Sequence, residues 1–525
     1  MILAARRWQQ HTIIGGVGTI FVVLALLPLL WPLFGLLGRE SGDILQSFHV
    51  FGSSRPWVLL ANSLGLSGAV VVGALALGTP MGLLLGRTDV AGRRVLLLAH
   101  GLPMFLPPFL LALGWFYLFG RRGYLGGEIS ATLLFSPVGH VALLSLVFTP
   151  VVTSLVVLGL WNLDPGLEEA ARVSARPFRV AKGILFPAAW PSVALGGILV
   201  FALSFSELGV PMFLRVDVYP AAIFSRLGGI DYNPGEAFLL ALPLVLVALA
   251  MVTGERWLFR KRPFDFFGMR HRHMELLPLG RWRGVLSTAC WGLTLFSLFP
   301  IFALAFKAGS GGGFAKVGQW VGGSLLSSLV SSGFAATIIV GIGAVLGHAR
   351  ARELPGSRFP DLVGVLAFVA PAVLLGVGII ALWNRPSTRL IYGGVGVIVV
   401  GYVARYSIVG IRTVAVAVAQ SRLSLEQAAA AFGAGYTRRL FSIVLPMHRR
   451  TLAVAWLLAA VFCLRDLETA VLYYPPDWQP LTVRIFTLEA NGPEAVVAGL
   501  AMVQVAVTMV MLALGLLVLT RRSGK

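Results

Sequence analysis

The chain alternates long, almost wholly apolar runs with short polar segments. The clearest runs are Thr12–Leu37, Leu59–Gly86, Val95–Phe119, Phe238–Met251 with its flanks, and Val496–Leu519. A helix needs about 20 apolar residues to cross the hydrocarbon core of a bilayer. Weaker runs fill the intervals between these five. The pattern therefore predicts about twelve transmembrane helices.

Strands are a poor alternative to helices. Membrane barrels show short segments that alternate apolar and polar residues, whereas residues 22–37 read VVLALLPLLWPLFGLL. The first run follows Arg6 and Arg7, as a signal peptide would, but it is too long for one and has no evident small-residue cleavage site. We expect it to be a retained first helix. The predicted class is an all-α polytopic membrane protein.

Composition agrees with this class. The 525 residues are 57% hydrophobic and 12% charged, against about a quarter charged in ordinary soluble domains. Mean hydropathy is +0.85. The two cysteines, Cys290 and Cys463, each fall inside a predicted helix, so neither a disulfide framework nor a thiolate metal site is expected.

The net charge of +20 lies on one face of the predicted topology. When the polar segments are assigned alternately to the two sides, the inner segments carry the whole excess of Lys and Arg. This is the positive-inside pattern, and it predicts that both termini lie in the cytoplasm. It also argues against nucleic-acid binding, because no soluble basic domain carries the charge.

The two halves of the chain repeat each other. Asn62–Arg87 resembles Ser327–Arg350. Three further matches follow in the same order: Pro107 and Gly114 with Pro371 and Gly378, Glu207-Leu208 with Asp466-Leu467, and Pro234–Ala237 with Pro493–Ala495. A parallel duplication is a common device of transporters. We predict two tandem six-helix halves, residues 1–258 and 283–525, joined by a basic cytoplasmic linker, residues 259–282, that is solvated or touches anionic lipid headgroups.

A longer polar loop follows the fourth predicted helix of each half. These loops span residues 163–187 and 421–446. Each offers a short, acidic, alanine-rich helix, a break, a basic segment, and a proline that begins the fifth helix. Asp164 or Ser424 can cap the short helix. Small alanine side chains there leave a surface that a partner can approach closely.

The two loops resemble the EAA loop of type-1 ABC importer permeases, in which E-A-A is followed by three residues, Gly, nine residues and I-x-L-P. The second loop matches this spacing at these positions: Ala428, Ala429, Gly433, Ile443, Leu445 and Pro446. It has Gln427 at the usual Glu position, with Glu426 just before it. The first loop has Glu169, Ala170 and Ala171 for E-A-A, with Glu168 just before them as a further docking candidate. It is one residue shorter to Pro187 and has Ser174 or Ala175 where Gly is expected.

The resemblance implies that each loop forms a coupling helix that docks in a groove of a separate ATP-hydrolysing subunit. That subunit is expected to be a homodimer that holds ATP and Mg, and a periplasmic or lipoprotein solute-binding protein is expected to deliver the cargo. The implied location is the bacterial inner membrane. Fusion of both halves in one chain looks like the iron(III) and thiamine importers. Ferric iron fits the resemblance best, and thiamine, polyamines and phosphonates stay open.

The sequence contains no G-x-x-x-x-G-K-[ST] phosphate loop, so we expect no cofactor in this chain and no enzyme activity of its own. A secondary transporter or channel could also have twelve helices in two repeats. A solitary carrier, however, has no need for two matched alanine-rich loops. A membrane enzyme would need a catalytic cluster, which the sequence lacks.

Several ionisable residues fall inside the apolar runs, where charge is costly and usually functional. Four of them are predicted near the outer ends of the fifth helices: Glu207, Arg465, Asp466 and Glu468. The correspondence of Glu207 with Asp466 suggests a position facing the pseudo-twofold axis, either in the pathway and its outer gate or in structural salt bridges. We expect His140 and Arg405 to be satisfied structural residues. The remaining feature is a predicted kink in each third helix at these prolines: Pro107, Pro108 and Pro371.

Overall fold

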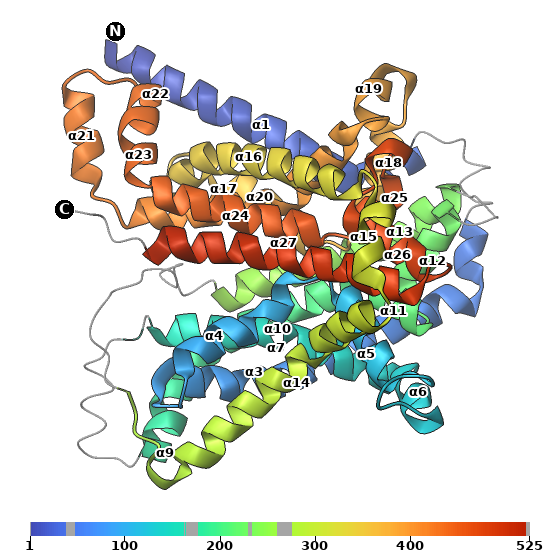
Figure 1. Ribbon diagram of the computed structural model, residues 1–525. Coiled ribbons are helices and arrows are strands. Elements are labelled where there is room, and N and C mark those ends of the chain that lie inside the picture. Colours follow the sequence, from blue (N-terminus) through green and yellow to red (C-terminus); the bar gives the residue numbers. More distant parts are fainter. Residues whose placement is uncertain are drawn as a thin grey trace.

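The computed structural model describes residues 2–37, 48–161, 163, 177–228, 234–259 and 276–520. Long helices run side by side through this part of the chain (Figure 1). Nine of its helices are long and apolar enough to cross a bilayer, and three bent helix pairs raise the number of candidate spans to twelve. The prediction of an all-α polytopic membrane protein with about twelve spans is confirmed.

The long elements repeat in the same order in the two halves. In the first half they are α1 (Ile2–Leu37), α3 (Ser54–Arg87), α4 (Arg93–Gly101) with α5 (Pro108–Phe119), α7 (Pro137–Trp161), α10 (Phe186–Ser206) and α13 (Pro234–Phe259). In the second half they are α14 (Arg283–Ser310), α16 (Ser324–Ala351), α17 (Arg358–Val369) with α18 (Ala372–Trp383), α20 (Val395–Ala419), α24 (Arg449–Arg465) and α27 (Glu494–Thr520).

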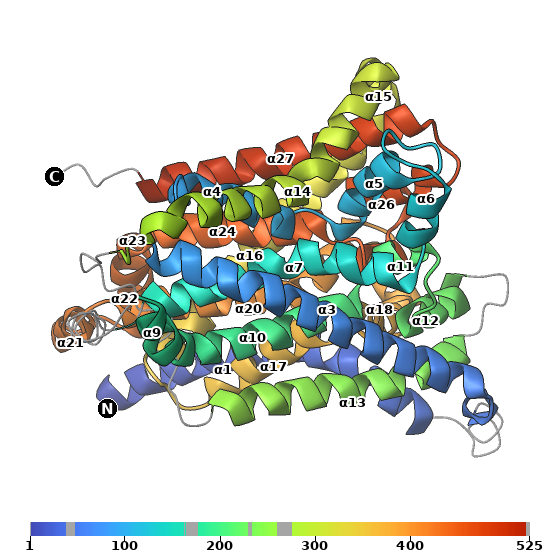
Figure 2. The same ribbon diagram turned by 90° about the horizontal axis from the view of Figure 1, so that it is seen from below.

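Short helices connect the long ones. On the α6 end of the bundle they are α6 (Glu128–Leu134), α11 (Gly209–Leu214), α12 (Tyr219–Gly228), α15 (Gly313–Val321), α19 (Arg389–Tyr392), α25 (Ala470–Tyr473) and α26 (Leu481–Glu489) (Figure 1). On the opposite end they are α9 (Pro177–Val180), α21 (Leu423–Ala431), α22 (Tyr436–Arg439) and α23 (Leu445–Met447). The first residues of α1 and the last residues of α27 lie at this second end as well (Figure 2).

The third span of each half is broken rather than merely kinked. The chain turns by 100° between Arg93–Phe105 and Pro108–Phe119, and by 107° between Arg358–Val369 and Ala372–Trp383. The predicted proline sites lie at these breaks, since Pro107 directly precedes α5 and Pro371 directly precedes α18. Proline lacks the N–H that would continue a helix. Non-helical backbone of this kind is tolerated at membrane depth where protein covers it.

Small residues allow the second and fourth spans of each half to approach closely. A Cβ added to Gly78 would lie 2.7 Å from Val152 Cβ, and one added to Gly82 would lie 2.6 Å from Val156 Cβ. The second half repeats this contact, because Cβ atoms on Gly343 and Gly347 would each meet the α20 backbone at 2.6 Å. Glycines four residues apart are a known packing device of membrane helices. This contact explains why the internal repeat is clearest in this segment.

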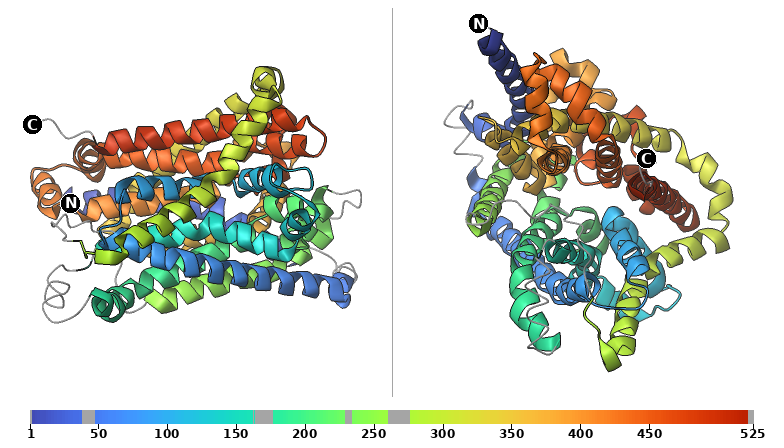
Figure 3. Two further views of the ribbon diagram at one scale, coloured as in Figure 1. Left: turned by 60° about the horizontal axis from the view of Figure 1, so that its bottom comes forward. Right: turned by 90° about the vertical axis from the view of Figure 1, so that its left-hand side faces the viewer.

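The first helix of each half crosses to the other half. Helix α1 packs against α16, α17, α18 and α20, and α14 packs against α4 and α5. Figure 3 shows dark-blue α1 beside the orange helices and yellow-green α14 beside the blue ones. The duplicated sequence halves are therefore interleaved in space. The junction is only partly described: of the predicted linker, residues 259–275 lie largely outside the described residues, and Leu277 forms a parallel bridge with Thr88.

A glycine at matching positions of the two halves allows close contact with α1 in one case and with α14 in the other. A Cβ on Gly378 of α18 would lie 1.9 Å from the carbonyl oxygen of Pro28 in α1. A Cβ on Gly114 of α5 would lie 2.3 Å from the carbonyl oxygen of Pro300 in α14. Only glycine fits at such distances. These contacts give a physical reason for the Gly114 and Gly378 match in the sequence.

We expect Gly378→Ala to lower the thermal midpoint of the detergent-purified chain, because overpacking of a close contact costs about 1–3 kcal/mol. Gly292→Ala on α14 is the control, since an added Cβ there meets nothing within 4 Å. The comparison is a thermal unfolding curve for each variant. Equal midpoints for the two variants would contradict the tight α1–α18 contact.

Candidate functional site

The second polar loop forms an ordered unit at one end of the bundle (Figure 2). Helix α21 is followed by α22, a π-helical turn at Leu440–Val444, and α23. Pro446 lies in the first turn of α23, where proline is favoured. The expected capping role of Ser424 is not seen. Ser424 lies inside α21, and the residue before this helix is Arg422.

Glu426 ties α21 to the end of α16. Its side chain is 6% exposed, and its two oxygens accept hydrogen bonds from His348 Nε2 at 2.8 Å and from Arg352 Nη2 at 2.6 Å. Arg352 Nη2 also donates to Ser421 Oγ at 2.8 Å. Burial alone would raise the pKa of Glu426, but the hydrogen bonds and charges of His348 and Arg352 outweigh it and lower the pKa below its ordinary value.

This position differs from the sequence expectation, which placed Glu426 among the residues that contact a partner. The structure turns its carboxylate inward, so Glu426 fixes the position of α21. The sequence does show two basic residues, His348 and Arg352, near the end of α16. It does not show that they pair with Glu426, because they lie more than 70 positions away from it in the chain.

Gly433 ends α21. It has φ +93°, a left-handed conformation that costs other residues more than glycine. Its N–H donates to the Ala430 carbonyl at 3.0 Å, and the N–H of Ala434 donates to the Ala429 carbonyl at 2.9 Å. These bonds are typical of a glycine helix terminus. The glycine of the EAA pattern is thus required by the backbone, in addition to leaving a small surface.

Helix α21 has exposed apolar side chains that no described residue covers. Leu423 and Leu425 are 46% and 48% exposed, and Phe432, just after the helix, is 94% exposed. Gln427 and Ala428 are exposed on the same helix, and Ala429 is half-buried.

Part of the first loop lies outside the described residues, including Glu168, Glu169, Ala170 and Ala171. Its described part repeats the second loop. Helix α9 leads into a π-helical turn at Ala181–Leu185, and Pro187 lies in the first turn of α10. The two loops therefore re-enter the bundle through the same local geometry.

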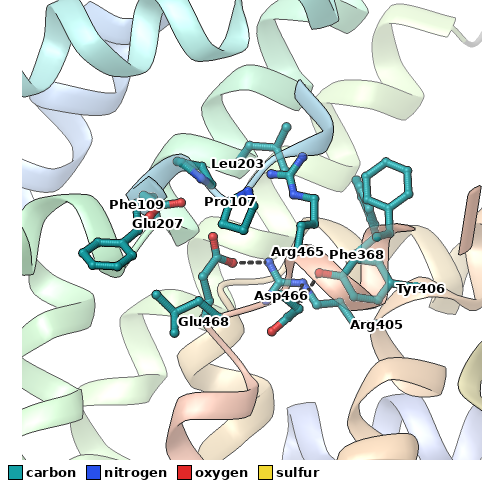
Figure 4. A pocket seen from close by; sticks show the side chains of 13 residues that line it. Pro107, Phe109, Leu203, Glu207, Phe368, Arg405, Tyr406, Arg465, Asp466 and Glu468 are labelled. Carbon is teal, nitrogen blue, oxygen red and sulfur yellow. Dashed lines mark hydrogen bonds and ion pairs between the residues drawn. The ribbon is translucent and has the colours of Figure 1, made fainter. Parts of the chain in front are cut away.

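A second group of chemically active side chains lies between the two halves, and we call it the inter-half cluster. It comprises Glu207, Arg405, Tyr406, Arg465, Asp466 and Glu468, which line one pocket together with Pro107, Pro108, Phe109, Leu203, Phe368, Phe462 and Leu467 (Figure 4). Glu207 follows α10 of the first half, and the other five belong to the second half.

Glu207 and Asp466 share a local role. Glu207 Oε1 accepts the N–H of Val210 at 3.1 Å, and Asp466 Oδ1 accepts the N–H of Thr469 at 2.9 Å. Each carboxylate thus caps the chain break that follows α10 or α24. The sequence placed both residues near the outer ends of their helices. They do lie at the helix ends, but Ser206, beside Glu207, is bonded to Arg405 near the midpoint of the 25-residue α20, so the cluster is deeper than expected.

Arg405 and Arg465 connect the halves. Arg405 Nη2 donates to Glu468 Oε2 at 2.7 Å and to Ser206 Oγ of the first half at 3.2 Å. Arg465 donates to the Met104 carbonyl of the first half. From the sequence we expected Arg405 to be only a satisfied structural residue. Its position in an apolar run was the signal for a functional role as well. His140 is buried and is not part of the cluster.

Comparisons with known proteins place this chain among transport permeases. Residues 78–262 match the family model for the binding-protein-dependent transport system inner membrane component. The ferric transport system permease protein FbpB of Actinobacillus pleuropneumoniae is 22% identical over 88% of this chain and 71% of its own length. A putative ferric transport system permease protein of Haemophilus influenzae is 24% identical over 80% and 70%. A putative 2-aminoethylphosphonate transport system permease protein of Salmonella choleraesuis is 30% identical over 43% and 88%.

Glu426→Gln should loosen α21 without changing the spans. Loss of charge-assisted hydrogen bonds worth about 1.5–3 kcal/mol should raise local opening roughly ten- to a hundredfold. The measurement is hydrogen–deuterium exchange of the amides of Leu423–Ala431. Glu353→Gln, at an exposed position after α16, is the control. If the amides of α21 exchange equally fast in Glu426→Gln and in the control, Glu426 does not anchor α21.

The same anchor predicts a pH dependence. The pKa of Glu426 is lowered in the folded chain, so its stabilising contribution is present at neutral pH. It is lost as the pH falls through that lowered pKa, in the acidic range below the ordinary pKa of a glutamate. Exchange of the α21 amides, corrected for the intrinsic effect of pH, should rise in that acidic range. Glu426→Gln should show no such rise.

Proposed function

This chain belongs to the family of binding-protein-dependent transport system inner membrane components, and from that premise we propose how its parts serve import. The chain is the membrane-spanning permease of an ATP-binding-cassette importer. Helix α21 is its docking element for the ATP-hydrolysing subunit, ferric iron is its cargo, and the inter-half cluster lies on the cargo pathway.

One observation supports the docking role most directly: α21 is anchored to the bundle on one side and has exposed apolar side chains on the other. Its buried Glu426 is bonded to α16, while Leu425 and Phe432 project an apolar surface into solvent. An exposed aromatic residue beside a rigid helix is a typical centre of a protein–protein contact. The flanking positions Gln427, Ala428 and Ala429 supply the small surface that allows close approach.

The contacts of α21 offer a route into the bundle. Glu426 connects it to α16, and the turn through Pro446 connects it to α24. Helix α16 packs against both α20 and α24. Arg405 lies on α20, and Asp466 and Glu468 follow α24. A displacement of α21 by a closing partner would therefore reach the inter-half cluster through packed helices.

The proposed function implies an orientation of the chain in the membrane. The end that carries α9 and α21 faces the cytoplasm, with both chain termini, as the distribution of Lys and Arg predicts. A homodimeric ATP-hydrolysing subunit would engage the two loops, one on each copy. The solute-binding protein would approach the opposite end, which carries α6, α12, α15 and α19.

Ferric iron is favoured as cargo by the extent of the matches. The two relatives whose names specify ferric transport align with 88% and 80% of the chain and thus span both halves. The relative named for 2-aminoethylphosphonate aligns with 43% of the chain. Phosphonate, thiamine and polyamine import remain the alternatives.

Phe432→Ala and Ala429→Arg should weaken the docking of the ATP-hydrolysing subunit while leaving the fold of the chain intact. Removal of a central aromatic contact, or added volume in a close contact, should cost about 1–3 kcal/mol, or roughly five- to a hundredfold in association. The measurement is the amount of ATP-hydrolysing subunit that co-purifies per permease. Phe359→Ala is the matched control, because Phe359 is 53% exposed at the start of α17, outside the motif. Co-purification equal to that of the control would exclude α21 as the docking helix.

The energy source gives a separate prediction. The purified chain alone should neither bind nor hydrolyse ATP, because its sequence has no phosphate loop. Binding of a fluorescent ATP analogue in nanodiscs measures this directly. Saturable binding by the chain alone would contradict the assignment of ATP hydrolysis to a separate subunit.

A further inference from the structure

The inter-half cluster is not symmetric, although it is built from duplicated elements. Helices α7 and α20 both have 25 residues and begin at Pro137 and Val395. In this register Thr149 matches Ser407, and each donates its hydroxyl to the carbonyl four residues earlier at 2.6 Å. The same register matches Arg405 with Val147 and Tyr406 with Phe148. The first half therefore lacks the cationic and hydroxyl groups that the second half supplies.

The two matched carboxylates consequently have different surroundings. Asp466 Oδ2 accepts the Tyr406 hydroxyl at 2.5 Å and lies 4.0 Å from Arg405 Nε. Glu207 is 3% exposed, and its Oε2 accepts no N–H or hydroxyl group among the described residues. The ionisable groups that act on it are the Glu468 carboxyl, which also shares a side-chain hydrogen bond with it, and the Arg465 guanidinium. Figure 4 shows Glu207 on the first-half side of the pocket, with Glu468 facing it.

The charges of the cluster do not balance. Three carboxylates, Glu207, Asp466 and Glu468, face the two guanidinium groups of Arg405 and Arg465. Arg405 is bound to Glu468, and Arg465 donates to a backbone carbonyl rather than to an acid. Glu207 and Glu468 are thus two adjacent, largely buried acids, and such a pair is costly at membrane depth when both are charged. A cation from outside this chain would relieve that repulsion.

We propose that Glu207 is the carboxylate that engages a cationic cargo in the pathway, and that Arg405 closes this site in the resting state. This inference rests on the proposed function and deepens it. It makes the inter-half cluster a transient binding site for a hard cation, because carboxylate oxygens are suitable ligands for such ions.

The resting structure is closed to such a cation. Within the described residues, no group of three or more His, Cys, Asp or Glu side chains is arranged to hold a metal ion. In this state Arg405 is bonded to Glu468, and Tyr406 is bonded to Asp466. Two bonds across the halves, Arg405 to Ser206 and Arg465 to Met104, hold this state. When the halves separate, these bonds break, and Glu207 and Glu468 become available to the cargo.

Two substitutions test the charge of Glu207 in different ways. Glu207→Gln keeps its size and the acceptor for Val210 but removes the charge. Val147→Arg keeps Glu207 and places a guanidinium at the position that corresponds to Arg405. Because Val147 is 2% exposed, Val147→Leu accompanies it as a packing control. Glu207→Asp keeps the charge and should retain part of the activity.

The assay uses the permease with its ATP-hydrolysing subunit in liposomes and radiolabelled ferric ion presented by the solute-binding protein. It measures iron uptake and ATP hydrolysis together. We expect Glu207→Gln and Val147→Arg to lower uptake roughly tenfold or more, with ATP hydrolysis per complex unchanged. A merely structural defect would lower both quantities or prevent assembly, and that outcome for both variants overturns the inference.

The outcomes separate this inference from the proposed function. If the unchanged complex takes up iron and both variants do so equally well, the role of Glu207 is wrong and the importer function stands. If the unchanged complex takes up no iron, the proposed cargo fails, and with it the inference that depends on a hard cation.

Discussion

A bilayer offers no hydrogen-bond partners, so this chain must satisfy or enclose its own polar groups at membrane depth. The exchange of first helices helps to meet that constraint. Helix α1 covers α18 and α14 covers α5, each across a glycine that admits a proline carbonyl. The broken third spans are thereby packed against the opposite half. The same enclosure buries Arg405, Asp466 and Glu207 between the halves.

The two proposed sites depend on one set of packed helices. Glu426 fixes α21 to α16, and α16, α20 and α24 pack together. The side chains that close the inter-half cluster come from α20 and from the segment after α24. Interlocked helices are displaced as units, so motion at α21 can reach Arg405 without a separate signalling element. The first loop enters the bundle through the same π-helical turn and proline, but Val147 and Phe148 stand where the second half has Arg405 and Tyr406.

The sequence predicted the parts of the fold that depend on local pattern. Apolar length predicted the spans, and the glycine-rich repeat predicted the duplication. Pro107 and Pro371 marked the sites where the third spans bend, but the sequence predicted kinks and the structure has breaks. The exchange of α1 and α14 was not predictable, because every apolar helix face suits lipid and protein equally well. The inward turn of Glu426 and the pairing of Arg405 with Glu468 depend on residues far apart in the chain. Gly433 was recognised as part of a motif, but its left-handed backbone required coordinates.

The central claim is that nucleotide-driven motion at α21 separates the two halves at the inter-half cluster. Arg94 and Arg358 are exposed and match each other at the starts of α4 and α17. Spin labels at cysteines replacing these two residues, in a chain whose Cys290 and Cys463 are changed to serine, report the distance between the halves. Double electron–electron resonance on the complex with its ATP-hydrolysing subunit should show this distance change between the nucleotide-free and ATP-trapped states. An identical distance distribution in both states would contradict the account.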